Sequence, residues 1–179
     1  MATVPNLPAV SEEEYLRTDY EPNCEYLDGV LVPKPFPDRI HSRLQLLLGS
    51  YLLSIEQAYG LSTTLEIHTR IRPGRWRVPD IAVVRSGWKD RYPDVDAAPL
   101  FTIEIVSKDE PWSELRGKVT DHLSMGIGTV IVSDPHTRTV LVATQSQSLR
   151  EIDPPLVVRV LIPGKDSLSI DFDHLFSQI

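Results

Sequence analysis

The order strand, helix, strand in residues 99–134 constrains the fold more than any other feature of the sequence. Residues 99–107 (PLFTIEIVS) and 129–134 (TVIVSD) are almost continuously apolar, which is typical of strands buried on both faces in the centre of a sheet. Between them the sequence predicts a helix over roughly residues 112–125, ended by Gly126. Two strands joined by a helix form a right-handed crossover with parallel strands. The chain is therefore predicted to contain a sheet with a parallel pair at its centre.

Local signals predict two further helices and a hairpin in the first third of the chain. Ser11 and Glu14 have the spacing of a capping box, so a short helix begins there. In residues 38–59 apolar side chains recur at intervals of three and four, which predicts a long helix that ends at Gly60. Asp28-Gly29, between apolar residues, predicts a hairpin turn.

The remaining elements complete an α/β fold with a mixed β-sheet core flanked by helices. Four more segments are predicted as strands, namely residues 63–72, 75–84, 138–144 and 156–162. Residues 171–176 are predicted as a helical turn that follows them. The polar residues 145–155 are predicted as a connection. A chain of 179 residues with 41% hydrophobic content suits one core, so we expect a flexible N-terminus over residues 1–10 and a single domain over 11–179.

Composition limits the class of protein and the kind of metal site. A single cysteine, Cys24, excludes an internal disulfide and a cysteine-built zinc site, and it agrees with a reducing cytoplasm. The five histidines form no H-x3-H pair, so a metal would be held by oxygen atoms. Neither a membrane-length apolar run nor a secretion signal is present in the sequence, so we expect a cytoplasmic protein without a membrane partner.

Two acidic residues occupy strand positions at which folding would partly remove water from a carboxylate. Asp80 leads the apolar run IAVV, and Glu104 interrupts residues 99–107. Two such charges about 4 Å apart repel by roughly 4 kcal/mol at an effective dielectric constant of 20, so something must offset them. A divalent cation, a shared proton or a cationic side chain such as Lys118 would do so, and two carboxylates with a backbone carbonyl suit Mg²⁺. The alternative to a metal site is that Asp80 only caps a turn after Pro79 and that Glu104 forms a structural salt bridge.

The only dense basic run is RIRPGRWR at residues 70–77. Pro73-Gly74 predicts a turn, so its arginines flank the tip of a hairpin; they are Arg70, Arg72, Arg75 and Arg77. The tip is either a solvated hairpin end or a phosphate contact. A net charge of −7 argues against a protein that coats nucleic acid without specificity, but it allows a local basic groove.

Several motifs together resemble the Uma2 family of endonucleases, which belongs to the PD-(D/E)xK restriction-nuclease-like superfamily. The resemblance runs from about residue 12 to 142. The matching positions are Pro79-Asp80, Glu104-Ile105-Val106-Ser107, Lys118 on its helix, Gly126, the strand end Ser133-Asp134-Pro135, the E-x-x-D-G segment from Glu25 to Gly29, and His41. Each motif is weak alone, whereas their order and spacing are fairly specific.

The resemblance implies a restriction-endonuclease-like mixed β-sheet core flanked by helices, a metal site, and a role for each residue. Asp80, Glu104 and the main-chain carbonyl of Ile105 would bind Mg²⁺ or Mn²⁺, which polarises the scissile phosphate and lowers the pKa of a bound water. Lys118 would orient that water and stabilise the charge that develops on the phosphate. Glu25 would be a further acid, contacting the metal directly or through water. The alternative for Lys118 is a solvated position on the helix with no catalytic role. The alternative for Glu25 is a position at the edge of a hairpin.

The sequence also departs from the family pattern. The superfamily lysine normally stands two residues after the second acid, where this chain has Val106, and the family's helix tyrosine is replaced by His122. We expect His122 to lie on the helix surface, with a phosphate contact or proton transfer as the alternative. The predicted nucleic-acid contacts are the four hairpin arginines, His41 and Ser107, although Ser107 is better explained as a helix cap.

The favoured function is a Mg²⁺-dependent DNA endonuclease. The alternative is a catalytically inactive restriction-like domain that binds DNA or a protein partner, which Val106 and the negative net charge favour. A homodimer is compatible with the first function, because cutting two strands is often shared between two copies.

Overall fold

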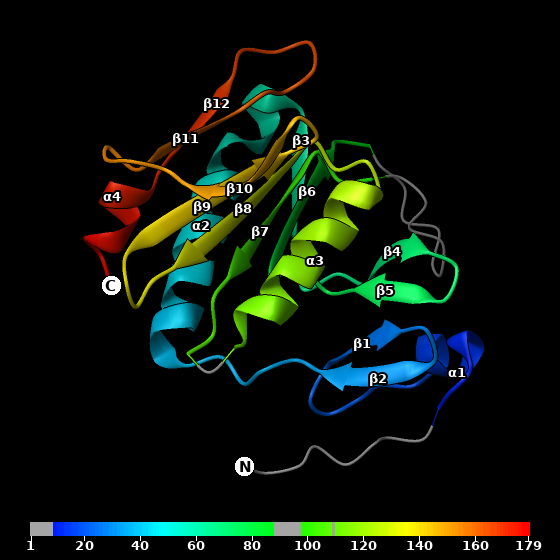
Figure 1. Ribbon diagram of the computed structural model, residues 1–179. Helices are drawn as coiled ribbons and strands as arrows, with labels where there is room; N and C mark the ends of the chain where they lie inside the picture. The colour runs from blue at the N-terminus through cyan, green and yellow to red at the C-terminus, as the bar shows by residue number, and fades with distance from the viewer. Residues whose placement is uncertain (1–8, 88–97, 109) are drawn as a thin grey trace.

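A six-stranded sheet forms the centre of the molecule in the computed structural model, which describes residues 9–87, 98–108 and 110–179 (Figure 1). Its strand order is β10-β9-β8-β7-β6-β3. The bounds are β3 Leu61–Leu65, β6 Ile81–Arg85, β7 Phe101–Ile105, β8 Thr129–Asp134, β9 Thr139–Thr144 and β10 Gln147–Glu151. β7 and β8 are parallel, and the other neighbouring pairs are antiparallel. The sheet is therefore mixed, as predicted from the crossover.

Helices cover both faces of this sheet (Figure 1). α3 (Trp112–Ser124) joins β7 to β8 and packs Leu115 and Val119 against the valines of β8. On the other face, α2 (Arg39–Tyr59) buries Leu44, Leu48 and Leu52 in the largest apolar cluster. β11 (Val157–Val160), β12 (Leu168–Asp171) and α4 (Phe172–Phe176) complete that cluster.

A smaller sheet of order β2-β1-β5-β4 stands beside the central one. Its strands are β1 (Cys24–Leu27), β2 (Val30–Pro33), β4 (Thr69–Arg72) and β5 (Arg75–Arg77), and α1 (Glu12–Arg17) packs Tyr15 near Trp76. The β1–β2 turn has positive φ at Asp28 (54°) and Gly29 (94°), which is the hairpin geometry that this dipeptide favours. This sheet carries Glu25 and the hairpin arginines to the edge of the central one.

Several predicted boundaries are confirmed by local geometry. The Ser11 side chain accepts a hydrogen bond from the Glu14 N–H, and Gly60 ends α2 with a left-handed conformation (φ 66°). The helical turn near the C-terminus is α4. The described chain contains no helix with the length and apolar character needed to cross a membrane. Of the predicted flexible segment 1–10, residues 1–8 lie outside the described part of the chain.

Two strand predictions are wrong. Residues 63–72 and 75–84 do not form two long strands, because each is divided between the sheets: β3 and β6 pair in the central sheet, and β4 and β5 pair in the smaller one. The chain leaves the first strand at Glu66, which has a φ of 51°, and the second near Pro79, which has no N–H for a sheet bond. The polar residues 145–155 also contain a strand, β10, at the sheet edge, where one face of a strand is solvated.

Candidate active site

Asp80 and Glu104 converge at the paired strands β6 and β7 of the central sheet. β6 and β7 pair with Ile81 opposite Ile103, so Asp80, one residue before the strand, comes next to Glu104. The Ile105 N–H donates a 2.7 Å hydrogen bond to Oδ2 of Asp80. Because side chains alternate along a strand, Glu104 points away from the α2 side, on which Ile103 and Ile105 pack. Asp80 precedes β6, and its carboxylate reaches His41 at the start of α2. Both acids are buried, with 4% and 1% of their surface exposed.

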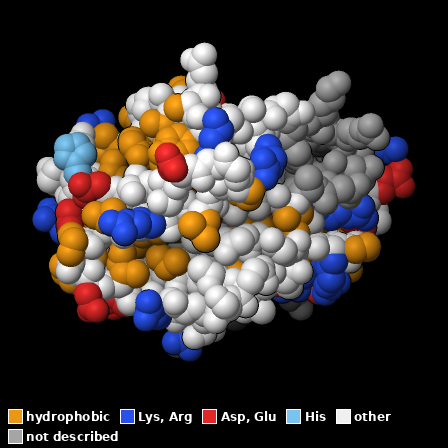
Figure 2. Space-filling model, turned by 90° about the horizontal axis from the view of Figure 1, so that it is seen from above, with side chains coloured by type: hydrophobic (Ala, Val, Ile, Leu, Met, Phe, Trp, Pro, Cys, Tyr) orange, Lys and Arg blue, Asp and Glu red, His pale blue; other side chains and the backbone are white. Residues whose placement is uncertain are grey.

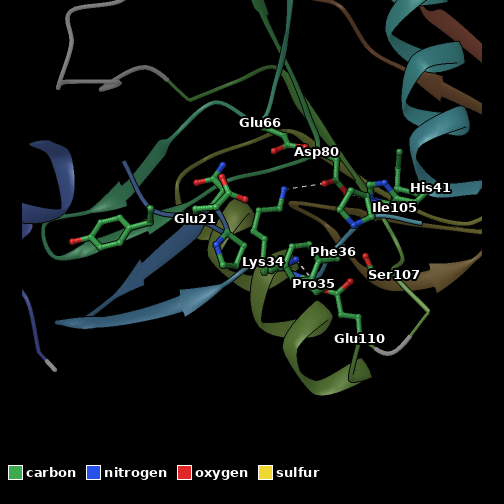
Figure 3. A pocket seen from close by; sticks show the side chains of 15 residues that line it. Glu21, Lys34, Pro35, Phe36, His41, Glu66, Asp80, Ile105, Ser107 and Glu110 are labelled. Atoms are coloured by element: carbon green, nitrogen blue, oxygen red, sulfur yellow. Dashed lines mark hydrogen bonds and ion pairs between the residues drawn. The ribbon is translucent and has the colours of Figure 1, made fainter. Parts of the chain in front are cut away.

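Asp80 is neutralised by a lysine and lies near a histidine, neither of which is close in sequence (Figure 3). Lys34 Nζ lies 2.9 Å from Oδ1, and His41 Nε2 lies 3.3 Å from Oδ2. Burial alone would raise the pKa of Asp80, but Lys34, His41 and the Ile105 N–H outweigh it and hold that pKa below its usual range. His41, predicted to contact nucleic acid, is itself buried and faces this carboxylate, so any such contact would be made through the cavity beside Asp80.

Glu104 has a matching pair of partners on α3. His122 Nε2 lies 2.8 Å from Oε1, and Lys118 Nζ lies 3.7 Å from Oε2. Burial would raise the pKa of Glu104, whereas Lys118 and His122 lower it, and the net effect is a lowered pKa. The prediction that His122 lies on the helix surface is wrong, because its side chain is fully buried. Positions 118 and 122 are one helical turn apart, so both side chains meet the same buried acid.

Lys118 is enclosed by acids and is not a solvated helix lysine. Its Nζ lies 2.7 Å from Oε1 of Glu110, and it is among the buried residues of α3. Burial would lower the pKa of Lys118, but the charges of Glu104, Glu25 and Glu110 together raise it. Burial keeps the pKa of Glu110 above its usual range even though Lys118 opposes that shift. Lys118 therefore remains a cation held beside Glu104.

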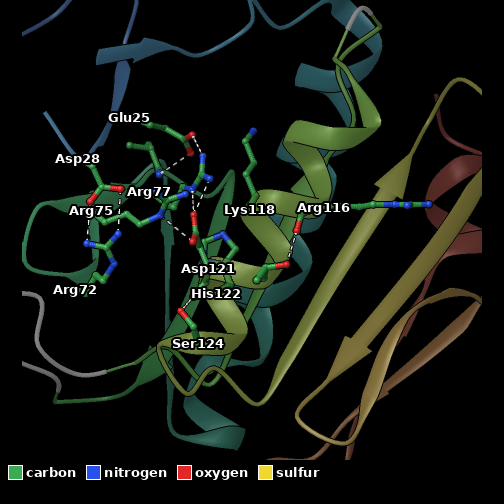
Figure 4. A network of polar contacts seen from close by, with 12 residues as sticks. Glu25, Asp28, Arg72, Arg75, Arg77, Arg116, Lys118, Asp121, His122 and Ser124 are labelled. Atoms are coloured by element: carbon green, nitrogen blue, oxygen red, sulfur yellow. Dashed lines mark hydrogen bonds and ion pairs between the residues drawn. The ribbon is translucent and has the colours of Figure 1, made fainter. Parts of the chain in front are cut away.

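Glu25 lies behind this group, in an ion-pair network with Arg77 and Asp121 (Figure 4). Arg77 donates to Oε2 of Glu25 at 2.5 Å and to Oδ2 of Asp121 at 2.6 Å, and the Val78 N–H donates to Oε1 of Glu25 at 3.2 Å. Glu25 is buried, with 2% of its surface exposed, and the charges of Glu25 and Lys118 interact. Glu25 is therefore not an edge residue of the hairpin, and both of its oxygens have protein partners.

The other hairpin arginines are also paired with acids. Arg72 and Arg75 lie 2.8 Å from the carboxylate of Asp28, and Arg70 pairs with Glu12 at 3.2 Å. The molecular face in Figure 2 shows Lys and Arg side chains scattered singly rather than gathered in one patch. Contact of these arginines with nucleic acid stays a prediction, and Arg72, with about half of its side chain exposed, is the most accessible of the four.

A cavity of about 270 Å³ opens beside Asp80 (Figure 3). It lies between the central sheet, the start of α2, the segment after β2 and the chain before β1. Its lining residues are Tyr20, Glu21, Pro22, Asn23, Lys34, Pro35, Phe36, Pro37, His41, Glu66, Asp80, Ile105, Ser107, Glu110 and Lys118. Four predicted site residues besides Asp80 therefore share one cavity, namely His41, Ile105, Ser107 and Lys118. Glu104, Glu25 and the four hairpin arginines are not among its lining residues.

The donor set beside the cavity suits a hard cation that keeps much of its water. Within the described residues, the structure contains no cluster of three or more His, Cys, Asp or Glu side chains that could hold a metal. Mg²⁺, however, is commonly held by one or two carboxylates and retains several water ligands. Asp80 and Ile105 line the cavity, and Glu104 lies beside Asp80 in the neighbouring strand. The residue types needed for Mg²⁺ or Mn²⁺, two carboxylates and a backbone carbonyl, are therefore close together.

Sequence reasoning missed four charged residues that line the cavity, namely Glu21, Lys34, Glu66 and Glu110, of which Lys34 and Glu110 contact predicted site residues. Lys34 follows β2, and its partner Asp80 is 46 residues away, so no local spacing connects them. The only signal was its place between Pro33 and Pro35, where the chain is held extended. Glu110 lies next to a predicted helix start, where acids are common for electrostatic reasons alone.

A mixed sheet that brings two acids from neighbouring strands together with a lysine on the next helix defines a restriction-endonuclease-like fold. The chain belongs to the Uma2 family, whose model, described as "Putative restriction endonuclease", matches residues 12–168.

A solved structure of similar architecture supports this assignment. It is the crystal structure of "a putative nuclease belonging to DUF820" from Anabaena variabilis ATCC 29413, with 26% identity and a TM-score of 0.78 over 94% of this chain and 98% of that one. A cryo-EM structure of a DrdV–DNA complex is similar only in part. The identity is 16% and the TM-score 0.36, over 61% of this chain and 9% of that one. None of the curated proteins matches the chain.

Proposed function

We propose that the protein is a Mg²⁺-dependent DNA endonuclease that hydrolyses phosphodiester bonds. The observation that carries the proposal is the convergence of Asp80 and Glu104, buried together and each facing a lysine, beside an open cavity. Membership of the Uma2 family supports it, as does the likeness to the Anabaena protein described as a nuclease.

In this proposal the chain's own residues bind the metal and position the reacting groups. Asp80, Glu104 and the Ile105 carbonyl would hold Mg²⁺ or Mn²⁺, and that ion would polarise the phosphate and lower the pKa of a water. Lys118 orients the water and stabilises developing negative charge. Glu25 acts through its charge on Lys118, since both of its oxygens are engaged by Arg77 and Val78.

The proposed substrate is DNA, bound at the mouth of the cavity. Ser107 and His41 border the cavity, and the arginines of the β4–β5 hairpin would contact the phosphate backbone farther from it. A location in the cytoplasm and a homodimer that cuts both strands belong to the same proposal. The expected contribution of each arginine is small, because binding DNA competes with its ion pair to Asp28, Glu12 or Glu25.

A second candidate function is a catalytically inactive domain that binds DNA or a protein. Two observations favour it: Val106 stands where the superfamily lysine is expected, and the side chains of Lys34, Lys118 and His122 already neutralise the two acids. This candidate retains the fold and the cavity but has no hydrolytic step.

The two candidates are separated by a plasmid-nicking assay. We expect the purified protein to convert supercoiled plasmid to the open circle with Mg²⁺ or Mn²⁺ and to leave it intact in excess EDTA. Asp80→Ala and Glu104→Ala, purified in parallel, should lower the initial rate by at least about 100-fold, because loss of a charge-stabilising group at a reacting centre has effects of this size. Equal nicking by all three proteins would identify a contaminant, and no nicking at all would favour the inactive domain.

A further inference from the structure

Lys34 is the one lysine of the cavity that touches Asp80. It follows β2 directly, and its side chain is 10% exposed. Its Nζ donates hydrogen bonds to Oδ1 of Asp80 at 2.9 Å and to the Val78 carbonyl at 2.8 Å (Figure 3). The side chain therefore reaches from the segment after β2, across the cavity, to the acid at the start of β6.

The ion pair of Lys34 with Asp80 leaves part of its hydrogen-bonding capacity unused. A lysine ammonium has three N–H donors, and the described residues accept two of them from Lys34. One donor remains for a water or a phosphate oxygen in the cavity, which Lys34 lines.

The superfamily carries a lysine two residues after the second acid, but this chain has Val106 there and so has no positive charge at that position. Val106 lies two residues after Glu104, on the same side of β7, and packs in the apolar cluster under α3 with Leu115. Lys118 is the other lysine that lines the cavity, but its Nζ lies 2.7 Å from Glu110 and 3.7 Å from Glu104. Of the two, only Lys34 contacts the carboxylate to which Ile105 also donates a hydrogen bond.

We propose that Lys34 is a catalytic residue whose ammonium contacts a non-bridging phosphate oxygen, and that it supplies a second positive charge beside Lys118 which the valine at position 106 cannot supply. This inference rests on the proposed endonuclease function. In the reaction the water oxygen bonds to phosphorus, the bond from phosphorus to the leaving sugar oxygen breaks, and the water's proton passes to solvent while the leaving oxygen gains one from solvent. Lys34 stays protonated throughout and stabilises the negative charge of the transition state.

The test compares cleavage with metal binding in the Lys34→Met protein. We expect plasmid nicking to fall by at least about 100-fold, the usual effect of losing one charge-stabilising donor. Calorimetric titration of Mn²⁺ into the DNA-free protein should give a dissociation constant equal to or lower than that of the natural protein, because removing a cation leaves the acid pair more negative. Lys165→Met, at an exposed lysine whose Nζ donates a hydrogen bond to the Ala58 carbonyl, is the matched control and should change neither.

A chemical rescue keeps the test decisive if methionine at position 34 prevents folding. In the Lys34→Cys protein, 2-bromoethylamine alkylates the new thiol with loss of bromide and restores an ammonium of nearly the same length. The single natural cysteine, Cys24, is buried, and burial raises the pKa of its thiol, so alkylation falls on position 34. We expect nicking to rise by at least about tenfold on alkylation.

Each outcome separates this inference from the proposed function. A natural protein that does not nick plasmid would overturn both. Nicking by Lys34→Met at the natural rate, or no recovery after alkylation of Lys34→Cys, would overturn the role of Lys34 and leave the endonuclease function standing. Loss of Mn²⁺ binding together with cleavage in a folded Lys34→Met protein would mean that Lys34 only holds Asp80 in place, which also overturns the inference.

Discussion

The Arg77→Met protein is expected to be less stable than the natural protein by about 3 to 5 kcal/mol, the usual cost of leaving buried charges without a partner. Arg77 is 5% exposed and contacts both Glu25 and Asp121. Its removal leaves the buried Glu25 carboxylate with the Val78 N–H as its one hydrogen-bond donor among the described residues. Urea denaturation at neutral pH, followed by circular dichroism, measures this loss.

Arg72→Met is the matched control for that experiment. Arg72 belongs to the same hairpin and pairs with Asp28, but the side chains of Arg72 and Asp28 are 54% and 49% exposed. Exposed ion pairs contribute about 0 to 1 kcal/mol, so the control should lose no more than that. Equal losses in the two variants would contradict the view that the Glu25–Arg77–Asp121 network is a buried support of the site.

Lys118→Met is expected to abolish cleavage and to destabilise the fold. Glu104 would retain His122 as its partner, whereas Glu110 would be left buried without its lysine, and breaking a buried pair in this way costs about 3 to 5 kcal/mol. Plasmid nicking should fall by at least about 100-fold, because Lys118 is proposed to orient the attacking water. The two effects are measured by urea denaturation and by initial nicking rates.

A second substitution separates these two effects. In Lys118→Met with Glu110→Gln, the acid that contacts the lysine most closely is made neutral, so at least about 1 kcal/mol of the lost stability should return. Cleavage should stay at the level of the single variant. If nicking recovers together with stability, Lys118 has a structural role only, and the proposed role in orienting water is wrong.

The central fold could be predicted because its signals are local or follow from connection rules. The apolar residues 129–134 and the helix before them specify a crossover without any knowledge of distant contacts, and β7 and β8 are indeed parallel. The ends of α2 followed from Gly60 and from the spacing of its apolar side chains. The convergence of Asp80 and Glu104 was implied by the resemblance to the family, and the pairing of β6 with β7 brings the two acids together.

The division of the chain between two sheets could not be predicted from periodicity. Residues 63–72 have a continuous β-like character, and the break depends on a positive φ at Glu66, a conformation that glutamate rarely adopts. The Glu66 N–H donates to the Asp80 carbonyl, so the break is held by a contact between the two predicted strands. Such a contact exists only once the sheet has formed.

The sequence could not identify the partners of the buried acids for a similar reason. His122 and Lys34 become partners of Glu104 and Asp80 only through packing of α3 and of the segment after β2. The general rule that buried carboxylates are paired required such partners, but it did not say which cations would supply them. A histidine on an amphipathic helix was therefore assigned to the wrong face.

Binding of Mn²⁺ to the DNA-free protein, measured by isothermal titration calorimetry, tests the central claim that Asp80 and Glu104 together hold a divalent cation. The natural protein should bind about one ion per chain, as expected for one pair of carboxylates. Asp80→Asn and Glu104→Gln, which keep the shape of each side chain, should each weaken binding by at least about tenfold. Undiminished Mn²⁺ binding by both variants, in protein that unfolds cooperatively like the natural chain, would contradict the account.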